Sequence, residues 1–201
     1  MNMPHLTQDD YAVSRWSGGV TVQLAIFPPE AAYGARDFLW RVSSAAVEDE
    51  RSVFTPLPDY DRLLMTLDGS LVLRHNGGEP FRLDPYQVHA FDGGAATESL
   101  GRCRDFNLML RKGRCRGALR PMRFAGAGEE VFRLSRPDGG FSRGTVLLYC
   151  ASGCGQAALG GAVCPLAEGE SFLAECAGDA MLRLTAFGTS DFIAAEIEIW
   201  Y

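Results

Sequence analysis

Apolar and polar residues alternate along most of the chain, and the three-to-four-residue spacing of an amphipathic helix is scarce. Alternation is typical of strands that bury one face. The clearest alternating runs are residues 20–27, 38–43 and 106–110. Glycine turn signals such as Asp68-Gly69 and Asp92-Gly93 separate runs of this kind. The pattern predicts an all-β fold with little helix, arranged as a sandwich or a barrel.

A strand-and-turn pattern in the middle of the chain recurs near its end. Three pairs of residues keep a nearly constant separation: Gly69 with Gly153, Leu83 with Leu166, and Leu100 with Leu184. The segment Asp105 to Leu108 also resembles the segment Asp191 to Ala194. Two copies of one β-unit explain the pattern, and chance matching of common turn sequences is the alternative.

The repeating unit of strand, glycine turn and strand describes a small jelly roll, the cupin barrel. Inward side chains either fill such a barrel or line a mouth that holds one small ligand. We therefore expect a bicupin, with two small jelly-roll barrels or sandwiches that arose by internal duplication. The first is expected at residues 1–111 and the second, packed on the first, at residues 112–201.

Charge and hydropathy narrow the classes of partner. The 201 residues carry a formal charge of −6, which argues against nucleic acid as a partner. The one basic run, residues 111–123, is interpreted as a solvated connection between the units, with a local RNA contact as the alternative. No apolar stretch approaches the length of a membrane span, and the start of the chain lacks the pattern of a signal peptide. We expect a cytoplasmic protein with no membrane partner.

The cysteines and histidines give little support for a metal or a cofactor. The six cysteines form no CxxC pair and are expected to be free thiols that act as small core residues, with a zinc site at Cys150, Cys154, Cys164 and Cys176 as the alternative. Only His5, His75 and His89 are present, and no His-x-His pair occurs. No nucleophile elbow, dinucleotide fingerprint or Walker loop is found. We expect no cofactor and no metal, and the balance is against an enzyme. The alternative is a metal-dependent cupin enzyme, a dioxygenase or an isomerase, that uses His75 or His89 with nearby carboxylates.

Polar residues interrupt otherwise apolar strands. Arg41 and Ser43 share one strand face, Asp105 and Asn107 share another, and Arg62 opens an apolar run. A buried guanidinium is costly unless it is paired, so these residues indicate either an internal salt-bridged network with Asp105 or a bound acid. The residues alone leave both interpretations open.

Several segments together resemble the HutD/Ves family of bacterial bicupins. They are Trp16 to Thr21 with Gln23, Phe38 to Ala45, Phe54 to Arg62, Leu67 to Gly69, and Asp105 to Met109. The second half is similar only by pattern, at Gly144 to Leu148 and Glu196 to Trp200. The turn after Trp16 is shorter than the turn of the family and lacks its Asn, which leaves open any backbone contact made by the longer turn.

The resemblance implies a two-barrel protein without the metal triad, which restrains histidine utilisation by binding an intermediate. The Ves branch is linked more loosely to stress responses. Such intermediates, urocanate and formylglutamate, are small carboxylates, so the ligand interpretation becomes preferred over the network. We expect an anionic metabolite at Arg41 and Arg62, oriented by Thr21, Gln23, Ser43 and Asn107 and walled by Trp16 or Trp40. A homodimeric interaction scaffold is a further alternative.

Overall fold

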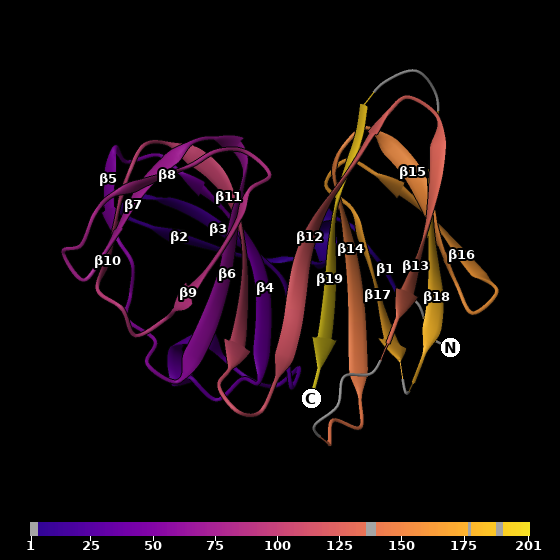
Figure 1. Cartoon of the computed structure of the whole chain (residues 1–201), viewed down its shortest axis with the longest axis horizontal. Coiled ribbons are helices and arrows are strands. Elements are labelled where there is room, and N and C mark those ends of the chain that lie inside the picture. Colours follow the sequence, from indigo (N-terminus) through magenta and orange to yellow (C-terminus); the bar gives the residue numbers. More distant parts are fainter. Residues whose placement is uncertain (1–3, 136–139, 177, 188–190) are drawn as a thin grey trace. The chain divides into compact units, whose positions relative to one another are not determined.

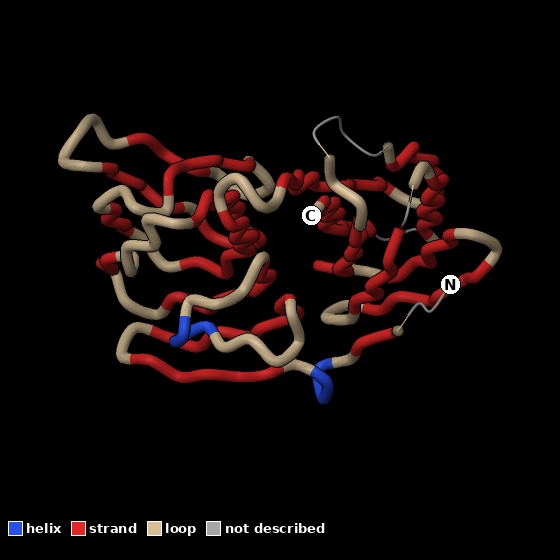
Figure 2. Tube along the Cα trace, turned by 90° about the horizontal axis from the view of Figure 1, so that it is seen from below, coloured by secondary structure: helices blue, strands red, loops and turns tan. Residues whose placement is uncertain are grey.

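Strands make up nearly all of the regular structure. The computed structural model describes residues 4–135, 140–176, 178–187 and 191–201. Within these ranges the helices are two short 3-10 turns, η1 (Gln8–Asp10) and η2 (Tyr33–Ala35), shown in blue in Figure 2. Neither has the length and apolar character needed to cross a membrane. The expected all-β class is confirmed.

The N-terminal unit comprises Tyr11–Arg114. Its strands, in indigo to magenta in Figure 1, are β2 (Ala12–Trp16), β3 (Gly19–Phe27), β4 (Trp40–Val47), β5 (Arg51–Val53), β6 (Tyr60–Gly69), β7 (Leu71–His75), β8 (Phe81–Leu83), β9 (Val88–Asp92), β10 (Thr97–Leu100) and β11 (Cys103–Arg111). They form one sheet of order β2-β3-β4-β11-β6-β9 and another of order β5-β10-β7-β8.

The C-terminal unit comprises Cys115–Tyr201 together with the residues up to Asp10. Its strands are β1 (His5–Leu6), β12 (Arg116–Ala125), β13 (Gly128–Leu134), β14 (Gly144–Ser152), β15 (Cys154–Leu159), β16 (Ala162–Ala167), β17 (Ser171–Cys176), β18 (Ala180–Ala186) and β19 (Asp191–Trp200). They form sheets of order β1-β17-β14-β19-β12 and β13-β18-β15-β16.

The start of the chain lies in the C-terminal unit, whereas the sequence analysis grouped it with residues up to 111. Strand β1 pairs with β17, with His5 opposite Phe172. His5 Nε2 also lies 2.9 Å from Glu170 Oε2. This pairing attaches the first described residues to the second half of the chain, and the chain passes from one unit to the other between Arg114 and Cys115.

The two units repeat one topology. The order β4-β11-β6-β9 becomes β12-β19-β14-β17, and β5-β10-β7-β8 becomes β13-β18-β15-β16, so each strand number rises by eight. Both units also carry a β-bulge at the same place, where the pairing passes over Leu67 in β6 and Ala151 in β14. The turn residues Gly69 and Gly153 follow at the same separation and have φ of 71° and 80°. The shared order and bulge support the expected internal duplication.

The register corrects one of the residue pairs used to find the repeat. Ser99 lies opposite Leu73, and Leu184 lies opposite Ala157, which is the counterpart of Leu73. Ser99 is therefore the counterpart of Leu184. Leu100 is 43% exposed, whereas Ser99 and Leu184 are buried, so the pairing of Leu100 with Leu184 was wrong by one position.

The bulge corrects a second pair in the same way. Asp105 lies opposite Thr66, and Ala194 lies opposite Cys150, which is the counterpart of Thr66. The counterpart of Asp105 is therefore Ala194, and the match of Asp105 with Asp191 was wrong. A bulge adds a residue to one strand only, so a constant separation along the sequence cannot locate it.

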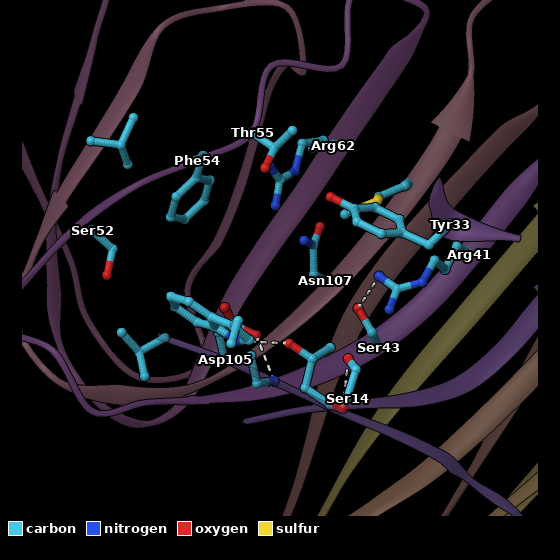
Figure 3. A pocket seen from close by; sticks show the side chains of 16 residues that line it. Ser14, Tyr33, Arg41, Ser43, Ser52, Phe54, Thr55, Arg62, Asp105 and Asn107 are labelled. Atoms are coloured by element: carbon cyan, nitrogen blue, oxygen red, sulfur yellow. Dashed lines mark hydrogen bonds between the residues drawn. The ribbon is translucent and has the colours of Figure 1, made fainter. Parts of the chain in front are cut away.

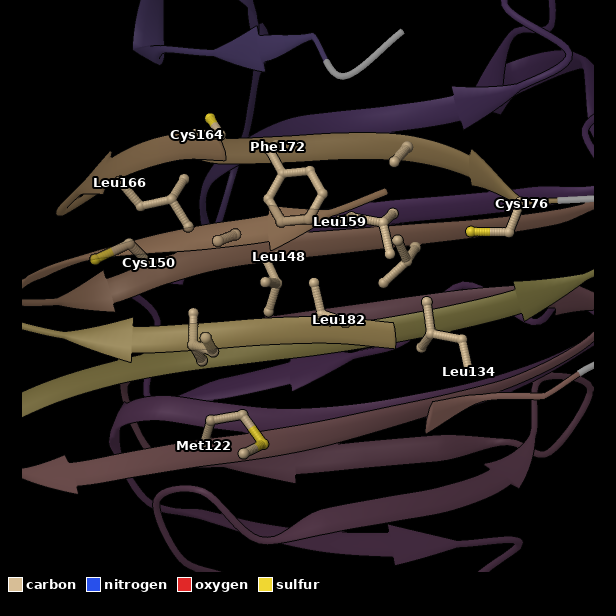
Figure 4. Close-up of a cluster of buried hydrophobic side chains, with 14 of the residues drawn as sticks. Met122, Leu134, Leu148, Cys150, Leu159, Cys164, Leu166, Phe172, Cys176 and Leu182 are labelled. Atoms are coloured by element: carbon tan, nitrogen blue, oxygen red, sulfur yellow. The ribbon is translucent and has the colours of Figure 1, made fainter. Parts of the chain in front are cut away.

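The C-terminal unit is filled by apolar side chains. Its buried cluster includes Leu148, Leu159, Phe172, Leu182 and Leu184, each 0–1% exposed (Figure 4). All six cysteines are free; five are buried as expected, and Cys154 is exposed. Burial raises the pKa of the Cys150 thiol to about 12, which is typical of an inert structural cysteine.

The apolar core of the N-terminal unit includes two clusters that are smaller than that of the C-terminal unit. One includes Leu64, Leu71 and Leu73, and the other includes Phe38 and Tyr60, whose rings stack 4.3 Å apart. Ala45 of the first cluster and Met109 of the second also line a cavity with polar walls inside the unit.

Candidate functional site

A cavity of about 310 Å³ opens within the N-terminal unit (Figure 3). This volume is at the lower end of the range for small-molecule sites. The side chains that line it are Ser14, Trp16, Thr21, Tyr33, Arg41, Ser43, Ala45, Val47, Ser52, Val53, Phe54, Thr55, Arg62, Asp105, Asn107 and Met109. The lining mixes hydroxyl groups, guanidinium groups and aromatic rings, which suits a small polar ligand.

Strand periodicity and register place the charged residues on one face. Successive side chains in a strand point to opposite faces, so Arg41 and Ser43 in β4 point the same way. In the sheet, Met109 of β11 lies opposite both Arg41 of β4 and Arg62 of β6. Asn107 lies opposite Ser43. Three neighbouring strands therefore direct polar side chains into one cavity.

Within the described ranges, no acidic side chain forms an ion pair with Arg62. Its side chain is 6% exposed, and its Nε is buried without a hydrogen-bond acceptor. The guanidinium carbon lies 4.7 Å from the ring centre of Phe54 and 5.3 Å from that of Phe91, so its neighbours are aromatic faces. Burial lowers the pKa of Arg62 to about 10, and the nearby carboxyl of Asp105 partly opposes this shift. Arg62 is still a cation at neutral pH.

Arg41 is held by neutral side chains. Its Nε donates to Gln23 Oε1 at 2.7 Å and its Nη1 donates to Ser43 Oγ at 2.9 Å. The guanidinium carbon lies 4.6 Å from the ring centre of Tyr33. Burial lowers the pKa of Arg41 as well, and the neighbouring Tyr33 and Asp105 oppose this shift. Gln23 and Ser43 therefore fix the direction of this guanidinium without neutralising it.

Asp105 lies in the same cavity and carries a strongly perturbed carboxyl. Its Oδ1 accepts a hydrogen bond from the backbone N–H of Ala45 at 2.9 Å. Burial raises the pKa of Asp105 from 3.8 to about 6, although that N–H and the charges of Arg62 and Arg41 act in the opposite direction. Desolvation therefore outweighs two nearby cations.

The internal network that the sequence left open does not form as salt bridges. Within the described ranges, no ion pair joins Arg41 or Arg62 to a carboxylate. The Oδ1 of Asn107 is also buried without a donor. Buried polar atoms are nearly always hydrogen-bonded, so Arg62 and Asn107 both have unused hydrogen-bonding capacity beside the cavity.

The structure brings most of the expected ligand residues together. Six of them line the cavity, namely Trp16, Thr21, Arg41, Ser43, Arg62 and Asn107. Trp16 Nε1 donates to Thr21 Oγ1 at 3.2 Å, which ties this ring to the next strand. Gln23 is outside the lining and supports it through its hydrogen bond to Arg41.

The structure corrects the expectation that Trp40 can form a wall of the pocket. Trp40 is 2% exposed and its ring stacks on Phe27 at 5.8 Å, outside the cavity lining. Trp40 immediately precedes Arg41 in β4, and adjacent residues of a strand point to opposite faces. Trp40 therefore cannot wall a pocket that Arg41 enters, and Trp16 alone provides the indole.

Sequence reasoning missed two aromatic residues of the cavity. Phe54 belongs to the segment Phe54 to Arg62 that carries the family resemblance, so a signal for it existed. Tyr33 comes from the connection between β3 and β4 and stacks on Phe38 at 6.3 Å. No strand pattern marks Tyr33, and only the fold brings it over Arg41.

The two histidines proposed as metal ligands lie together outside the cavity lining. His75 Nε2 is 3.0 Å from His89 Nε2, and His75 Nδ1 is 2.8 Å from Thr97 Oγ1. Burial lowers the pKa of both imidazoles, and Arg62 adds to the shift of His75. In the described part of the chain, no group of three His, Cys, Asp or Glu side chains is placed to hold a metal ion. The pair supplies two of the donors that the metal-dependent alternative requires.

Comparison with solved structures identifies the fold. A conserved protein of unknown function, PA5104 from Pseudomonas aeruginosa PAO1, is 28% identical with a TM-score of 0.83, and the match covers 99% of each chain. HutD from Pseudomonas fluorescens SBW25 is 21% identical with a TM-score of 0.72 over the full length of both chains. The cupin-fold pirin YhhW from Escherichia coli, solved with nickel(II), is 8% identical with a TM-score of 0.67 over 97% of this chain and 98% of the other. The expected bicupin fold is confirmed.

Sequence comparison identifies the family. Protein Ves of Cronobacter sakazakii is 33% identical over 152 residues, which are 72% of this chain and 74% of the relative. The HutD family model matches residues 8–193. That match spans both units and includes every residue of the cavity lining, so the chain belongs to the HutD family.

Proposed function

We propose that the N-terminal unit binds a small carboxylate at Arg62 and Arg41, and that the protein acts through this binding and not through catalysis. The observation that carries the proposal is the buried guanidinium of Arg62. Arg62 is 6% exposed and borders the cavity, and among the described residues no carboxylate forms an ion pair with it. A carboxylate matches the planar donor fork of arginine and would satisfy it.

Arg41 and Asn107 extend the same argument. Arg41 keeps donor capacity beyond its bonds to Gln23 and Ser43, since a guanidinium carries five N–H groups. Asn107 lines the cavity opposite Ser43 and can present its amide to the ligand. The rings of Tyr33 and Phe54 cover the guanidinium groups and exclude water, which strengthens the electrostatic attraction.

Membership of the HutD family gives the proposed ligand its context. We propose urocanate or formylglutamate as the carboxylate, with the protein acting in the cytoplasm as a regulator that senses an intermediate of histidine utilisation. A role in a stress response, the alternative from the Ves branch, uses the same site with a different acid. Homodimer formation stays a prediction, which analytical ultracentrifugation over a range of concentrations tests.

The test is calorimetry and thermal shift with urocanate, formylglutamate and histidine. The wild type is expected to bind one of the two carboxylates, and Arg62→Val is expected to weaken binding at least tenfold, since a buried charge pair loses about 2–5 kcal/mol on truncation. Arg74→Val is the matched control, because Arg74 is exposed on β7 outside the cavity lining. A wild type that binds neither acid, or an Arg62→Val variant that binds as tightly as the control, contradicts the proposal.

A further inference from the structure

The carboxyl of Asp105 faces the proposed ligand with one oxygen free. Its Oδ1 is occupied by the N–H of Ala45, and its backbone carbonyl accepts the hydroxyl of Ser44 at 2.6 Å. Among the described residues no side chain or backbone group bonds to Oδ2. Asp105 is 7% exposed and lines the cavity (Figure 3), so Oδ2 is the carboxyl oxygen that is left for a ligand.

The charged groups around Asp105 are few. Arg41 faces it from β4 and Arg62 from β6, while Tyr33 lies beside both guanidinium groups from the connection before β4. Cys103 is two residues away in β11, and its pKa is raised to about 12, so it is neutral at pH 7. Of the two histidines, His75 senses the charge of Arg62 but does not line the cavity.

These groups set the net charge of the cavity lining. Two guanidinium groups and an ionised Asp105 leave one net positive charge, which a single carboxylate balances. Two guanidinium groups and a protonated Asp105 leave two positive charges, which two carboxylates balance. Because unbalanced charge is costly in a site withdrawn from water, the protonation state of Asp105 selects the charge of the ligand.

We infer that Asp105 is the residue that sets ligand charge, so that the site admits a dicarboxylate by taking up one proton on Asp105. This inference rests on the proposed function. The protonated Oδ2 donates its hydrogen to an oxygen of one ligand carboxylate, while the two guanidinium groups bind the remaining oxygens. A monocarboxylate leaves Asp105 ionised and binds without the proton.

The sign of the pH dependence follows from the position of Asp105. Its pKa is already raised to about 6, and a second negative charge beside it disfavours the ionised form further. Above pH 6 a dicarboxylate therefore binds together with a proton, and its affinity rises as the pH falls. Linkage of one proton limits the change to about tenfold per pH unit.

Calorimetry with glutarate and butyrate tests this between pH 6 and 8, in buffers of different ionisation enthalpy. Glutarate is expected to take up close to one proton per site at pH 7.5 and to bind at least tenfold more tightly at pH 6 than at pH 8. Butyrate is expected to take up almost none. The proton count comes from the wild type, so the measurement does not depend on any variant that fails to fold.

Three variants locate the proton. Asp105→Asn keeps the acceptor for Ala45 N–H and supplies an N–H in place of the carboxyl O–H, so it is expected to bind glutarate without proton uptake and with a flat pH profile. Asp68→Asn, at an exposed carboxylate of β6 outside the lining, is the matched control that keeps the uptake. His89→Gln is also expected to keep the proton uptake, because His89 lies outside the cavity lining.

The outcomes separate the two proposals. Glutarate binding without proton uptake, or uptake that persists in Asp105→Asn or disappears in His89→Gln, overturns the role of Asp105 and leaves the carboxylate site standing. Absence of binding by every carboxylate at every pH overturns both.

Discussion

The two units share a strand order and a bulge, and their interiors differ at the positions that carry charge in the N-terminal unit. Arg62 of β6 corresponds to Val146 of β14, since each lies at the same distance from its bulge and glycine turn. Through the register, Arg41 corresponds to Ala118. Val146 is 1% exposed within the apolar cluster of the C-terminal unit.

Asp105 is a third charged residue whose counterpart is uncharged, because it corresponds to Ala194. Three charged positions of one unit are thus small or aliphatic residues in the other. Dispersion contacts and burial of apolar area explain why the C-terminal interior is filled. They do not explain two guanidinium groups and a carboxyl in the N-terminal unit, and the proposed carboxylate site gives these residues a role.

Among the substitutions that test this difference between the two interiors, Val146→Arg is expected to have the largest effect on stability. It places a guanidinium at the position of Arg62, within the apolar cluster of the C-terminal unit and opposite Glu198 of β19. The free energy of unfolding is expected to fall by about 3 kcal/mol, because burying a guanidinium in a filled core costs more than one cross-strand charge pair returns. Urea unfolding measures it, with Val131→Arg as the control because Val131 is 45% exposed. Equal stability of the two variants would mean that the C-terminal interior is not apolar in solution.

Arg62→Val makes the reverse exchange. Replacing an unpaired buried charge by an aliphatic residue is neutral or stabilising, so the free energy of unfolding is expected to change by less than about 1 kcal/mol or to increase. Binding of the carboxylate should nevertheless fall at least tenfold. A marked loss of stability in urea unfolding would show that Arg62 has a structural role and would count against its assignment to the ligand.

The pH dependence of stability should differ between Asp105→Asn and the wild type. The pKa of Asp105 is raised in the fold from 3.8 to about 6, so ionisation is harder in the folded than in the unfolded chain. The wild type therefore loses stability from this group as the pH rises from about 4 to about 6, and the variant does not.

The histidines act in the opposite direction. Their pKa values are lowered in the fold, so they cost stability as the pH falls below 6.5. They are present in both proteins and cancel when the two unfolding free energies are subtracted. A difference between the two proteins that does not change with pH would contradict the raised pKa of Asp105.

The smallest effect is expected at the surface of the C-terminal unit. Arg183 Nη1 lies 3.1 Å from Glu129 Oε1, and both side chains are about half exposed. Arg183→Ala should change the free energy of unfolding by less than about 1 kcal/mol, because solvent screens the pair. A larger loss in urea unfolding would show that charges contribute to the stability of this unit as well.

Periodicity predicted which polar residues share a strand face. Arg41 with Ser43, and Asp105 with Asn107, follow from alternation alone. The same rule places Trp40 away from Arg41, so that error was avoidable from the sequence. Tyr33 was not predictable, because its connection has no periodic pattern and its position over Arg41 depends on the packing of the unit.

The sequence by itself determined the strands, the duplication, the family and the polar residues that enter the N-terminal interior. Tertiary structure decided which of these residues meet in one cavity. Among the described residues it leaves Arg62 without an acid partner and one carboxyl oxygen of Asp105 without a hydrogen bond. The physical reason is that alternation acts between neighbours in the chain. Ion pairing, burial and pKa instead depend on strand register, on a one-residue bulge and on distances between segments far apart in sequence.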